Sequence, residues 1–266
     1  MKINILKNHA SLLRDFFLDL IFPTNCLDCG QEGAWLCNTC FHRLTFKKSQ
    51  HCLECKKNNQ FGEFCPECLP KYFLDGVWIA GDYENKIIQN LIKNLKYRFV
   101  KNISLTLGNY LSLFLRNLIN QARLKPADIK ENLNWRRFEV LKNTPNILLN
   151  FNHSIIIPVP LHKKRERWRS FNQSRMIAEI VAKNFHRPLI NDLKRIKHKK
   201  PQAKLSETER QKNILDCFSW QAKNLTNHDI ILIDDVVTTG STLHECARVL
   251  KKNGAREVWG LVVAKG

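Results

Sequence analysis

The sequence predicts an α/β fold, in which a parallel sheet flanked by helices is preceded by a small cysteine-rich domain. The first observation is a series of short apolar runs that alternate with stretches of helical periodicity. The second is a cluster of eight cysteines that comes before the first of those runs. Fully apolar runs are typical of parallel strands, which are covered on both faces. At 266 residues the chain has room for one large domain and one small one.

The expected elements follow one another along most of the chain. Residues 1–25 have the pattern of an amphipathic lead-in helix, which charges interrupt and no signal-peptide cleavage site follows. Residues 120–150, with two prolines and several asparagines, are expected to form a surface insertion with some helix. The expected order of the main domain is strand 77–83, helices 85–98 and 103–120, strand 155–160, helix 174–185, a strand from 230, a helix ending before Gly254, and strand 258–264.

Eight of the ten cysteines form four Cys-x-x-Cys pairs within residues 26–68. Two thiolates at this spacing lie on one tight turn and can bind the same Zn²⁺, and two such pairs complete a tetrahedral site. Four pairs predict two structural zinc sites, whose metal would stabilise a segment too short to bury its own core. The predicted ligands are Cys26, Cys29, Cys37, Cys40, Cys52, Cys55, Cys65 and Cys68.

The sequence leaves the pairing of these cysteines open. Sequential pairing puts the first four in one site and the last four in the other, whereas cross-braced pairing interleaves them. Disulfides are disfavoured because no secretory signal is recognised, and a redox dithiol would need one pair rather than four. His42 and His51 lie in the same segment and are expected to be bystanders rather than ligands.

A run of acidic and hydroxyl residues follows the apolar stretch 230–233. Asp234 and Asp235 come where that strand is expected to end, and a helical pattern begins directly after the run. Ligands of open α/β sheets bind beyond the carboxyl ends of the strands, and a helix N-terminus favours phosphate. The carboxylates fit neighbouring sugar hydroxyls or a divalent metal. The run therefore predicts a ribose 5-phosphate site, with the phosphate bound by Thr238, Thr239, Gly240, Ser241 and Thr242.

A cationic segment follows the strand predicted at 155–160. Five Lys and Arg side chains occur within residues 163–169, and we expect them on a loop at the carboxyl end of that strand. Arg makes bidentate contacts with phosphate, while Trp168 and Phe171 can stack on a base. A charged, solvated loop is the alternative. The candidate anion-binding residues are His162, Lys163, Lys164, Arg165, Arg167 and Arg169.

Two further basic segments bear on the same site. The end of helix 85–98, Leu95-Lys96-Tyr97-Arg98, presents cations and a tyrosine either next to the phosphate site or on a solvated face. Residues 194–212 carry eight Lys and Arg and few apolar anchors, so we expect a mobile loop there. Cys217 and Cys246 lie outside the cysteine cluster and are expected to be buried core residues.

The charge of the whole chain bounds its partners. A formal net charge of +19 points to nucleic acid, phosphorylated ligands or acidic lipid, although a demand for solubility gives the same sign. A face rich in Lys and Arg suits single-stranded DNA through backbone electrostatics and base stacking. No apolar run approaches the ~18 residues of a membrane-spanning helix. We therefore expect a cytoplasmic protein.

The run from 230 to 242 resembles the 5-phosphoribosyl 1-pyrophosphate (PRPP) motif of type I phosphoribosyltransferases. That resemblance implies that Asp234 and Asp235 bind the ribose and that residues 238–242 bind the 5-phosphate. It also implies that the loop at 162–169 binds pyrophosphate together with Mg²⁺, and that residues 194–212 close over PRPP. The run lacks the Gly-Lys-Ser/Thr ending of a P-loop, which disfavours a nucleotide triphosphatase.

The order of all these motifs, including Pro-Val-Pro-Leu-His before the cations and Phe-Asn-Gln after them, resembles the ComF family. The resemblance covers nearly all of 26–266, with 120–150 outside it. Ser170 departs from it, since the family usually has glycine there. The family implies a double zinc ribbon over 26–70, a phosphoribosyltransferase-like domain over 77–266, and a role in natural transformation (DNA uptake). It further implies incoming single-stranded DNA, a ComFA-type helicase and other competence proteins as partners.

Three functions agree with these features. The first is a PRPP-binding protein that handles DNA on the cytoplasmic side with little or no transferase turnover. The second is an active transferase that moves ribose 5-phosphate from PRPP to an unidentified acceptor and releases pyrophosphate. The third is a zinc-ribbon adaptor that keeps the phosphate site only as structure.

Overall fold

The structure, a computed structural model, describes residues 24–123, 145–197, 214–222 and 224–266. The chain divides into two compact units, Met1–Thr45 and Phe46–Gly266. The lead-in helix expected at 1–25 lies almost wholly outside the described residues, as do most of the insertion expected at 120–150 and most of the basic segment 194–212. Within the described residues, no helix is long and apolar enough to cross a membrane.

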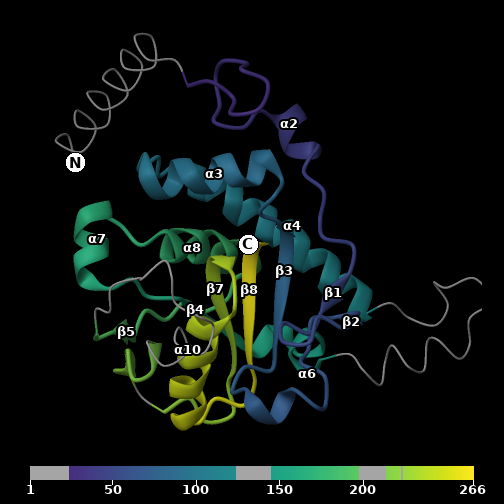
Figure 1. Cartoon of the computed structure of the whole chain (residues 1–266), viewed down its shortest axis with the longest axis vertical. Coiled ribbons are helices and arrows are strands. Elements are labelled where there is room, and N and C mark those ends of the chain that lie inside the picture. Colours follow the sequence, from purple (N-terminus) through teal and green to yellow (C-terminus); the bar gives the residue numbers. More distant parts are fainter. Residues whose placement is uncertain (1–23, 124–144, 198–213, 223) are drawn as a thin grey trace, which may run out of the picture. The chain divides into compact units, whose positions relative to one another are not determined.

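The first unit folds around the first four cysteines. Its chain turns sharply after Cys29, where Gly30 takes a backbone φ of 78° that glycine adopts without strain. The next two cysteines flank the start of the short helix α2 (Asn38–His42) and bring the chain back to the first pair. This unit is the purple segment of Figure 1.

The second unit is built on four parallel strands in the order β3-β8-β7-β4 (Figure 1). Each strand follows a helix or loop that crosses back over the sheet, as parallel pairing requires. The sheet strands are β3 (Gly76–Asp82), β4 (Ser154–Pro158), β7 (Asp229–Val237) and β8 (Val258–Lys265). The helices are α3 (Lys86–Tyr97), α4 (Ile103–Arg123), α6 (Asn146–Leu149), α7 (Lys163–Arg169), α8 (Gln173–Phe185) and α10 (Ser241–Lys252). The α/β fold with helices on a parallel sheet is confirmed.

Apolar side chains project from both faces of the sheet and are buried by helices. On one face, Ile230 and Leu232 of β7 share a buried cluster with Leu243 and Ala247 of α10. Side chains of successive residues alternate between faces, so Ile231 and its neighbours point to the other side, where α8 packs on β7 and β4 and α4 packs on β8 and β3. Fully apolar strands arise because both faces are covered.

The second group of cysteines belongs to the same unit as the sheet. Its hairpin, β1 (Gln50–His51) with β2 (Asn58–Asn59), leads into a segment that runs along the outer edge of β3. The side chain of Gln50 donates to the carbonyl of Ile79 at 3.1 Å and accepts from its N–H at 2.9 Å, which replaces a neighbouring strand. Gly62 accepts from the N–H of Val77, and the edge of the sheet is thereby covered.

Two expectations about the edge of the sheet were wrong. The strand from 230 does not end before Asp234, because β7 continues to Val237 and stays paired with β8, for example Val236 with Ala264. The segment 162–169 is not a loop, because residues 163–169 form α7. Lys, Arg and Glu favour helix, and the His162 side chain accepts from the N–H of Lys164 at the N-terminus.

Smaller elements complete the second unit. The start of the basic segment, expected as a mobile loop, pairs instead as β5 (Leu193–Arg195) with β6 (Phe218–Trp220), in antiparallel register. Single-turn 3₁₀ helices lie at Leu69–Lys71 and Phe151–His153. Cys217 and Cys246 are fully buried, as expected. Gly254, with φ of 96°, directly follows the C-cap of α10 and confirms the predicted helix end.

Candidate functional site

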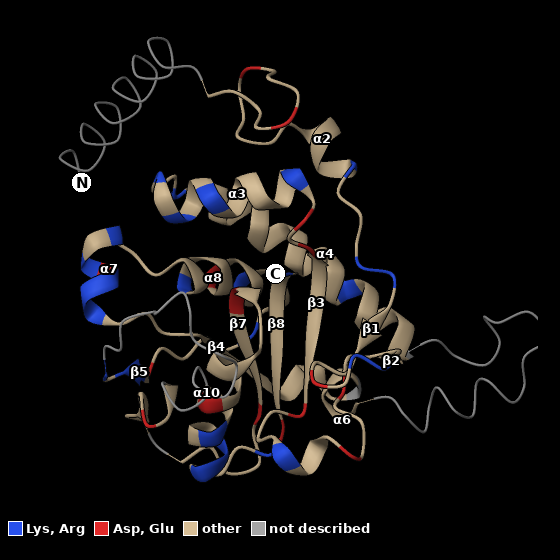
Figure 2. Cartoon of the chain, in the orientation of Figure 1, with Lys and Arg blue, Asp and Glu red and all other residues tan. Residues whose placement is uncertain are grey.

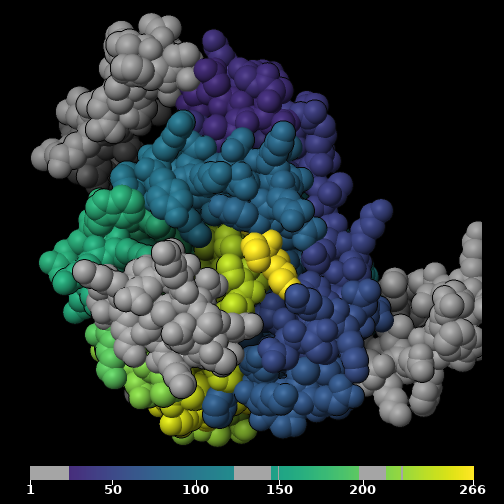
Figure 3. Space-filling model, viewed as in Figure 1, coloured from purple at the N-terminus to yellow at the C-terminus, as the bar shows by residue number. Residues whose placement is uncertain are grey.

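A cavity of about 370 Å³ opens at the carboxyl ends of β4 and β7. It exists because β4 ends at Pro158, opposite Ile233, while β7 runs four residues further beside β8. In Figure 3 the yellow-green atoms at the end of β7 are recessed beside α3. The position is the one at which open α/β sheets bind ligands. Its wall comprises Lys96, Tyr97, Val159, Pro160, Leu161, Arg165, Trp168, Arg169, Gln173, Ser174, Arg195, Asp234, Asp235, Val236 and Thr242.

The two aspartates lie in this cavity in different surroundings. Asp235 is buried, and its Oδ2 lies 2.8 Å from Nζ of Lys96, the lysine near the end of α3. Although burial lowers the pKa of Lys96, the carboxylates of Asp235 and Asp234 outweigh this and raise it. Within the described part of the chain Asp234 has no ion-pair partner; its Oδ1 accepts from Oγ of Ser174 at 2.7 Å and from the N–H of Asp235 at 2.9 Å. Burial, with the charge of Asp235, raises the pKa of Asp234 to about 7.

Two arginines supply the cavity with hydrogen-bond donors, and of these Arg169 is buried and Arg195 is partly buried. Arg169, at the end of α7, is only 5% exposed and donates through one amino group to Gln173. Arg195, on β5, is brought to the wall because its strand bridges to His162 and its guanidinium stacks on Phe218. Among the described residues, neither Nε has a hydrogen-bond acceptor. Burial lowers the pKa of both arginines, so an anionic ligand would offset the cost of removing these charges from water.

The hydroxyl run forms the turn that enters α10. Gly240 takes φ of 78°, and a Cβ at this position would lie 2.3 Å from Cδ2 of Leu53, so both the turn and its packing favour glycine. Oγ1 of Thr239 and Oγ of Ser241 are 2.8 Å apart. The first-turn N–H groups of α10 have no carbonyl partner within the helix and carry a partial positive charge. Thr242 reaches the cavity wall, and the other four residues form the turn beside it.

The cationic helix α7 contributes to the cavity through one face only. Arg165 and Arg169 line the cavity, whereas Lys163, Lys164 and Arg167 are exposed on α7. The difference follows from helical geometry, because residues four apart share a face. Figure 2 shows the Lys and Arg positions along α7 and the acidic end of β7. Four cations and two carboxylates therefore line the cavity.

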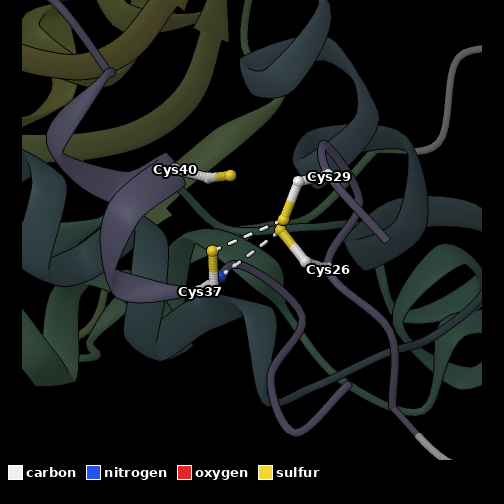
Figure 4. Close-up of side chains that lie close together, drawn as sticks. All are labelled: Cys26, Cys29, Cys37 and Cys40. Carbon is white, nitrogen blue, oxygen red and sulfur yellow. Dashed lines mark hydrogen bonds between the residues drawn. The ribbon is translucent and has the colours of Figure 1, made fainter. Parts of the chain in front are cut away.

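Both cysteine groups have the geometry of a tetrahedral metal site. The sulfur atoms of Cys26, Cys29, Cys37 and Cys40 all lie within 4.8 Å of one another, and so do those of Cys52, Cys55, Cys65 and Cys68. This result decides for sequential pairing. Figure 4 shows the side chains of the first group gathered around one centre. Neither His42 nor His51 joins a group within the described residues; His42 contacts the carbonyl of Asn38, and His51 contacts Lys265.

The spacing of the sulfurs, and the surroundings of Cys26 and Cys52, fit thiolate ligands of zinc. The Sγ atoms of Cys29 and Cys37 are 3.6 Å apart, and so are those of Cys55 and Cys65, close to the spacing of two thiolates bound at about 2.3 Å to one Zn²⁺. Burial opposes ionisation of Cys26, but N–H groups of its own turn and of Cys37 outweigh it and lower its pKa to about 6. The same balance lowers the pKa of Cys52 to about 7. Zinc bound here would close the turns and stabilise the fold.

Sequence reasoning missed several residues of the cavity. Ser174 and Gln173 come directly after the Asn172 N-cap of α8, so the Phe-Asn-Gln sequence marked a helix start that points at the acidic pair. Arg195 was assigned to a mobile loop, and no local signal shows that its strand pairs with His162. The Lys96-Tyr97 pair does reach the site, which resolves the alternative left open for the end of α3.

The fold and the cavity define a phosphoribosyltransferase-type domain that is combined with zinc-binding ribbons. The family described as "Phosphoribosyl transferase domain" matches residues 172–265, and that described as "Double zinc ribbon domain" matches residues 17–69. Competence protein F of Haemophilus influenzae is 30% identical over 238 residues, which cover 86% of this chain and 90% of that protein. The chain therefore belongs to the ComF family.

Two other relatives match a smaller part of the chain. Competence protein ComFC of Bacillus subtilis is 42% identical over 104 residues, which cover 38% of this chain and 40% of that protein. The DNA utilization protein YhgH of Escherichia coli O157:H7 is 35% identical over 109 residues, covering 40% of this chain and 48% of that protein.

Proposed function

We propose that this protein binds PRPP and acts in natural transformation, where it handles incoming single-stranded DNA on the cytoplasmic side. The observation that carries the PRPP site is the cavity lined both by an acidic pair and by two arginines whose buried Nε donors have no acceptor among the described residues. Cations are suited to the pyrophosphate, and carboxylates to the ribose hydroxyls. Competence protein F and ComFC are relatives named for competence, and YhgH for DNA utilization, which supports the DNA role.

Each group of the cavity has a task in this proposal. The turn 238–242 and the first N–H groups of α10 bind the 5-phosphate. Arg165, Arg169 and Arg195 bind the pyrophosphate, and Asp234 with Asp235 bind the ribose. Mg²⁺ would enter with the pyrophosphate, whose charge it neutralises, and the carboxylate of Asp234, which lines the cavity, would be its protein ligand. The exposed cations of α7 attract the DNA backbone.

Calorimetry with PRPP and Mg²⁺ tests the site. Wild-type protein should bind, and Asp234→Asn and Asp235→Asn should each weaken binding about tenfold or more, as expected when a charged hydrogen-bonding group is lost. Asp82→Asn is a matched control, since Asp82 ends β3 at the same edge of the sheet and does not line the cavity. If wild-type protein does not bind PRPP, the proposal is wrong.

The DNA role needs a separate test in cells. A Haemophilus influenzae strain without competence protein F should regain transformation when it expresses this chain, and should not when it expresses Asp235→Asn at an equal level. Purified protein should bind single-stranded DNA with an affinity that falls steeply as salt rises. An affinity that salt leaves unchanged contradicts the electrostatic part of the proposal.

An active transferase is the second candidate, and the lining of the cavity favours it. Tyr97 and Trp168 line the same cavity as the acidic pair, and their rings suit stacking on an acceptor base. In that reaction an acceptor displaces pyrophosphate from C1 of PRPP, and Arg169 and Arg195 stabilise the departing charge. Pyrophosphate release with a panel of bases, ammonia and nucleic acid distinguishes turnover from binding alone.

A further inference from the structure

Three exposed aromatic side chains lie at the edge of the cavity. Tyr97 is 62% exposed, Trp168 is 59% exposed and Phe99 is 39% exposed. Tyr97 and Trp168 also line the cavity, and the ring of Phe99 meets that of Trp168 edge-on, with centroids 5.1 Å apart. We name Tyr97, Phe99 and Trp168 the aromatic mouth. Exposed aromatic clusters of this kind mark sites of interaction.

The backbone holds two of these rings in place at a cost. Phe99 takes φ of 59° just after α3, and Ser170 takes φ of 65° just after α7. A side chain other than glycine rarely adopts this left-handed region, and an aromatic one less often than Asn or Asp. The two residues end the helices so that Phe99 and Trp168 face each other. Strain of this kind gathers at functional sites.

The surroundings of the aromatic mouth carry positive charge. Arg98, Lys101, Lys163, Lys164 and Arg167 are all exposed on the same two segments, and Figure 2 shows the cations of α7. Nζ of Lys101 lies 5.6 Å from the ring centre of Phe171, so this lysine is held close by. Aromatic faces between cations are how proteins bind single strands: the rings stack on bases and the cations meet phosphates.

We propose that the aromatic mouth binds a nucleobase ring, stacked on Trp168 and Tyr97, at the entrance of the PRPP site. This inference rests on the proposed function, since it places the ring next to the ligand bound in the cavity. The stacked nucleobase can come from two sources: a single-stranded nucleic acid, or a free base that serves as the acceptor. The cations around the aromatic mouth favour the single-stranded nucleic acid, because they can bind its phosphates.

Paired oligonucleotides test the stacking. Wild-type protein should bind oligothymidylate about tenfold more tightly than an abasic oligonucleotide of equal length, because each stacked base contributes measurably. Trp168→Ala and Tyr97→Ala should remove most of that preference, while Trp168→Phe should keep part of it. Leu113→Ala is the control, since Leu113 on α4 is 44% exposed and lies outside the cavity wall. Equal binding of both oligonucleotides by wild-type protein overturns the inference, and so does an undiminished preference in Trp168→Ala.

Two further measurements separate the sources and the hypotheses. Free bases are titrated into protein saturated with PRPP: binding that Trp168→Ala abolishes assigns the mouth to a free base, and binding of the strand alone assigns it to nucleic acid. If neither binds, the inference is wrong. Calorimetry with PRPP on the same variants separates the two hypotheses. If the wild-type protein binds PRPP but does not prefer oligothymidylate to the abasic oligonucleotide, the inference on the aromatic mouth is wrong and the PRPP site stands.

A second inference comes from contacts between the second cysteine group and the phosphate turn. Leu53, which lies between Cys52 and Cys55, is buried directly against Gly240. Behind it, the N–H of Phe73 donates to Nδ1 of His244 at 3.3 Å, and Tyr72 meets the same imidazole edge-on with centroids 5.1 Å apart. The phosphate turn and the first turn of α10 therefore rest on this cysteine segment.

We infer that metal in the second cysteine group positions the phosphate turn, whereas metal in the first group does not. This inference also rests on the proposed PRPP site. The contacts above join the second group to the unit of the sheet, and the first group belongs to the other unit. Without the metal, the turn at Cys52–Cys55 is no longer held by coordination of its thiolates, and Leu53 no longer supports Gly240.

The two groups offer a matched pair of substitutions. Cys29 and Cys55 are the exposed cysteines of their groups, so Cys29→Ser and Cys55→Ser remove equivalent ligands. Each should lower the bound zinc by one ion per chain, but only Cys55→Ser should weaken PRPP binding, by about tenfold if one charged hydrogen bond is lost. Leu53→Ala should keep both zinc ions and still weaken PRPP, which covers the case in which Cys55→Ser unfolds. Equal effects of Cys29→Ser and Cys55→Ser, or none of Leu53→Ala, overturn the inference.

Discussion

The carboxylate of Asp234 should lower the stability of the folded protein as pH rises, and its replacement by asparagine should remove this loss. Burial, followed by the charge of Asp235, raises the pKa of Asp234 from 3.8 to about 7 in the folded protein. An acid with a raised folded pKa contributes stability below its unfolded pKa and loses it as pH rises through the folded one. At about 1.4 kcal/mol per tenfold change in proton affinity, the full cost above pH 7 is about 4 kcal/mol.

Asp234→Asn removes this cost and keeps the geometry, because the amide oxygen can still accept from Ser174 and from the N–H of Asp235. We expect the variant to be about 2 to 4 kcal/mol more stable at pH 8, which raises Tm by about 5 to 10 °C for a domain of this size. The gain should shrink steadily below pH 7 and be small near pH 4. Loss of zinc at low pH affects both proteins alike and cancels in the difference.

Thermal denaturation of wild type and Asp234→Asn across this pH range is the assay, and Asp82→Asn is the control, since an exposed strand-end acid should change Tm little at any pH. The same variant should bind PRPP less well, so stability and function move in opposite directions, as is common at binding sites. A lower Tm for Asp234→Asn at pH 8, or a difference that does not change with pH, would refute the reasoning.

Three other predictions concern the wall of the cavity. Lys96→Met leaves the carboxylate of Asp235 buried without its partner, so we expect a loss of about 3 kcal/mol in denaturant unfolding, which the double variant with Asp235→Asn should largely restore. Arg195→Met removes a guanidinium whose buried Nε donor has no acceptor among the described residues. The Tm of the variant should therefore equal or exceed that of the wild type. Calorimetry should show that it binds PRPP about tenfold more weakly. Ser170→Gly relieves a left-handed residue at the end of α7 and should raise the free energy of unfolding by about 0.5 to 1 kcal/mol, and a destabilised variant would contradict that account of Ser170.

Much of the fold follows from local patterns in the sequence. Strands 77–83, 155–160 and 258–264 and the helices that follow the first two lie within a few residues of their expected positions, because their apolar periodicity agrees with burial on two faces. The spacing of the cysteines predicts the two four-cysteine sites. It does not predict which pairs combine, since that depends on how the chain folds back at α2 and at the β1–β2 hairpin.

The errors come from contacts between distant parts of the chain. Whether β7 ends before Asp234 is decided by Ala264 and Lys265 of β8, which pair with Val236 and Val237 and keep the strand extended. Within residues 230–242 alone, two acidic residues after an apolar run predict the end of a strand. Arg195 enters the cavity only because its strand bridges to His162. Local composition marked that arginine as part of a charged segment and nothing more.

The two cysteine groups lie in different units of the fold, although each consists of two Cys-x-x-Cys pairs. As sequence, residues 26–68 form one repetitive segment, and the double zinc ribbon family matches it as a whole. In the structure the division into units falls at Thr45, between the second and third Cys-x-x-Cys pairs. The second group covers the edge of β3 and supports Gly240, so its substitution should be felt in the phosphate site. The first group lies in the other compact unit, so its substitution should leave the phosphate site unchanged.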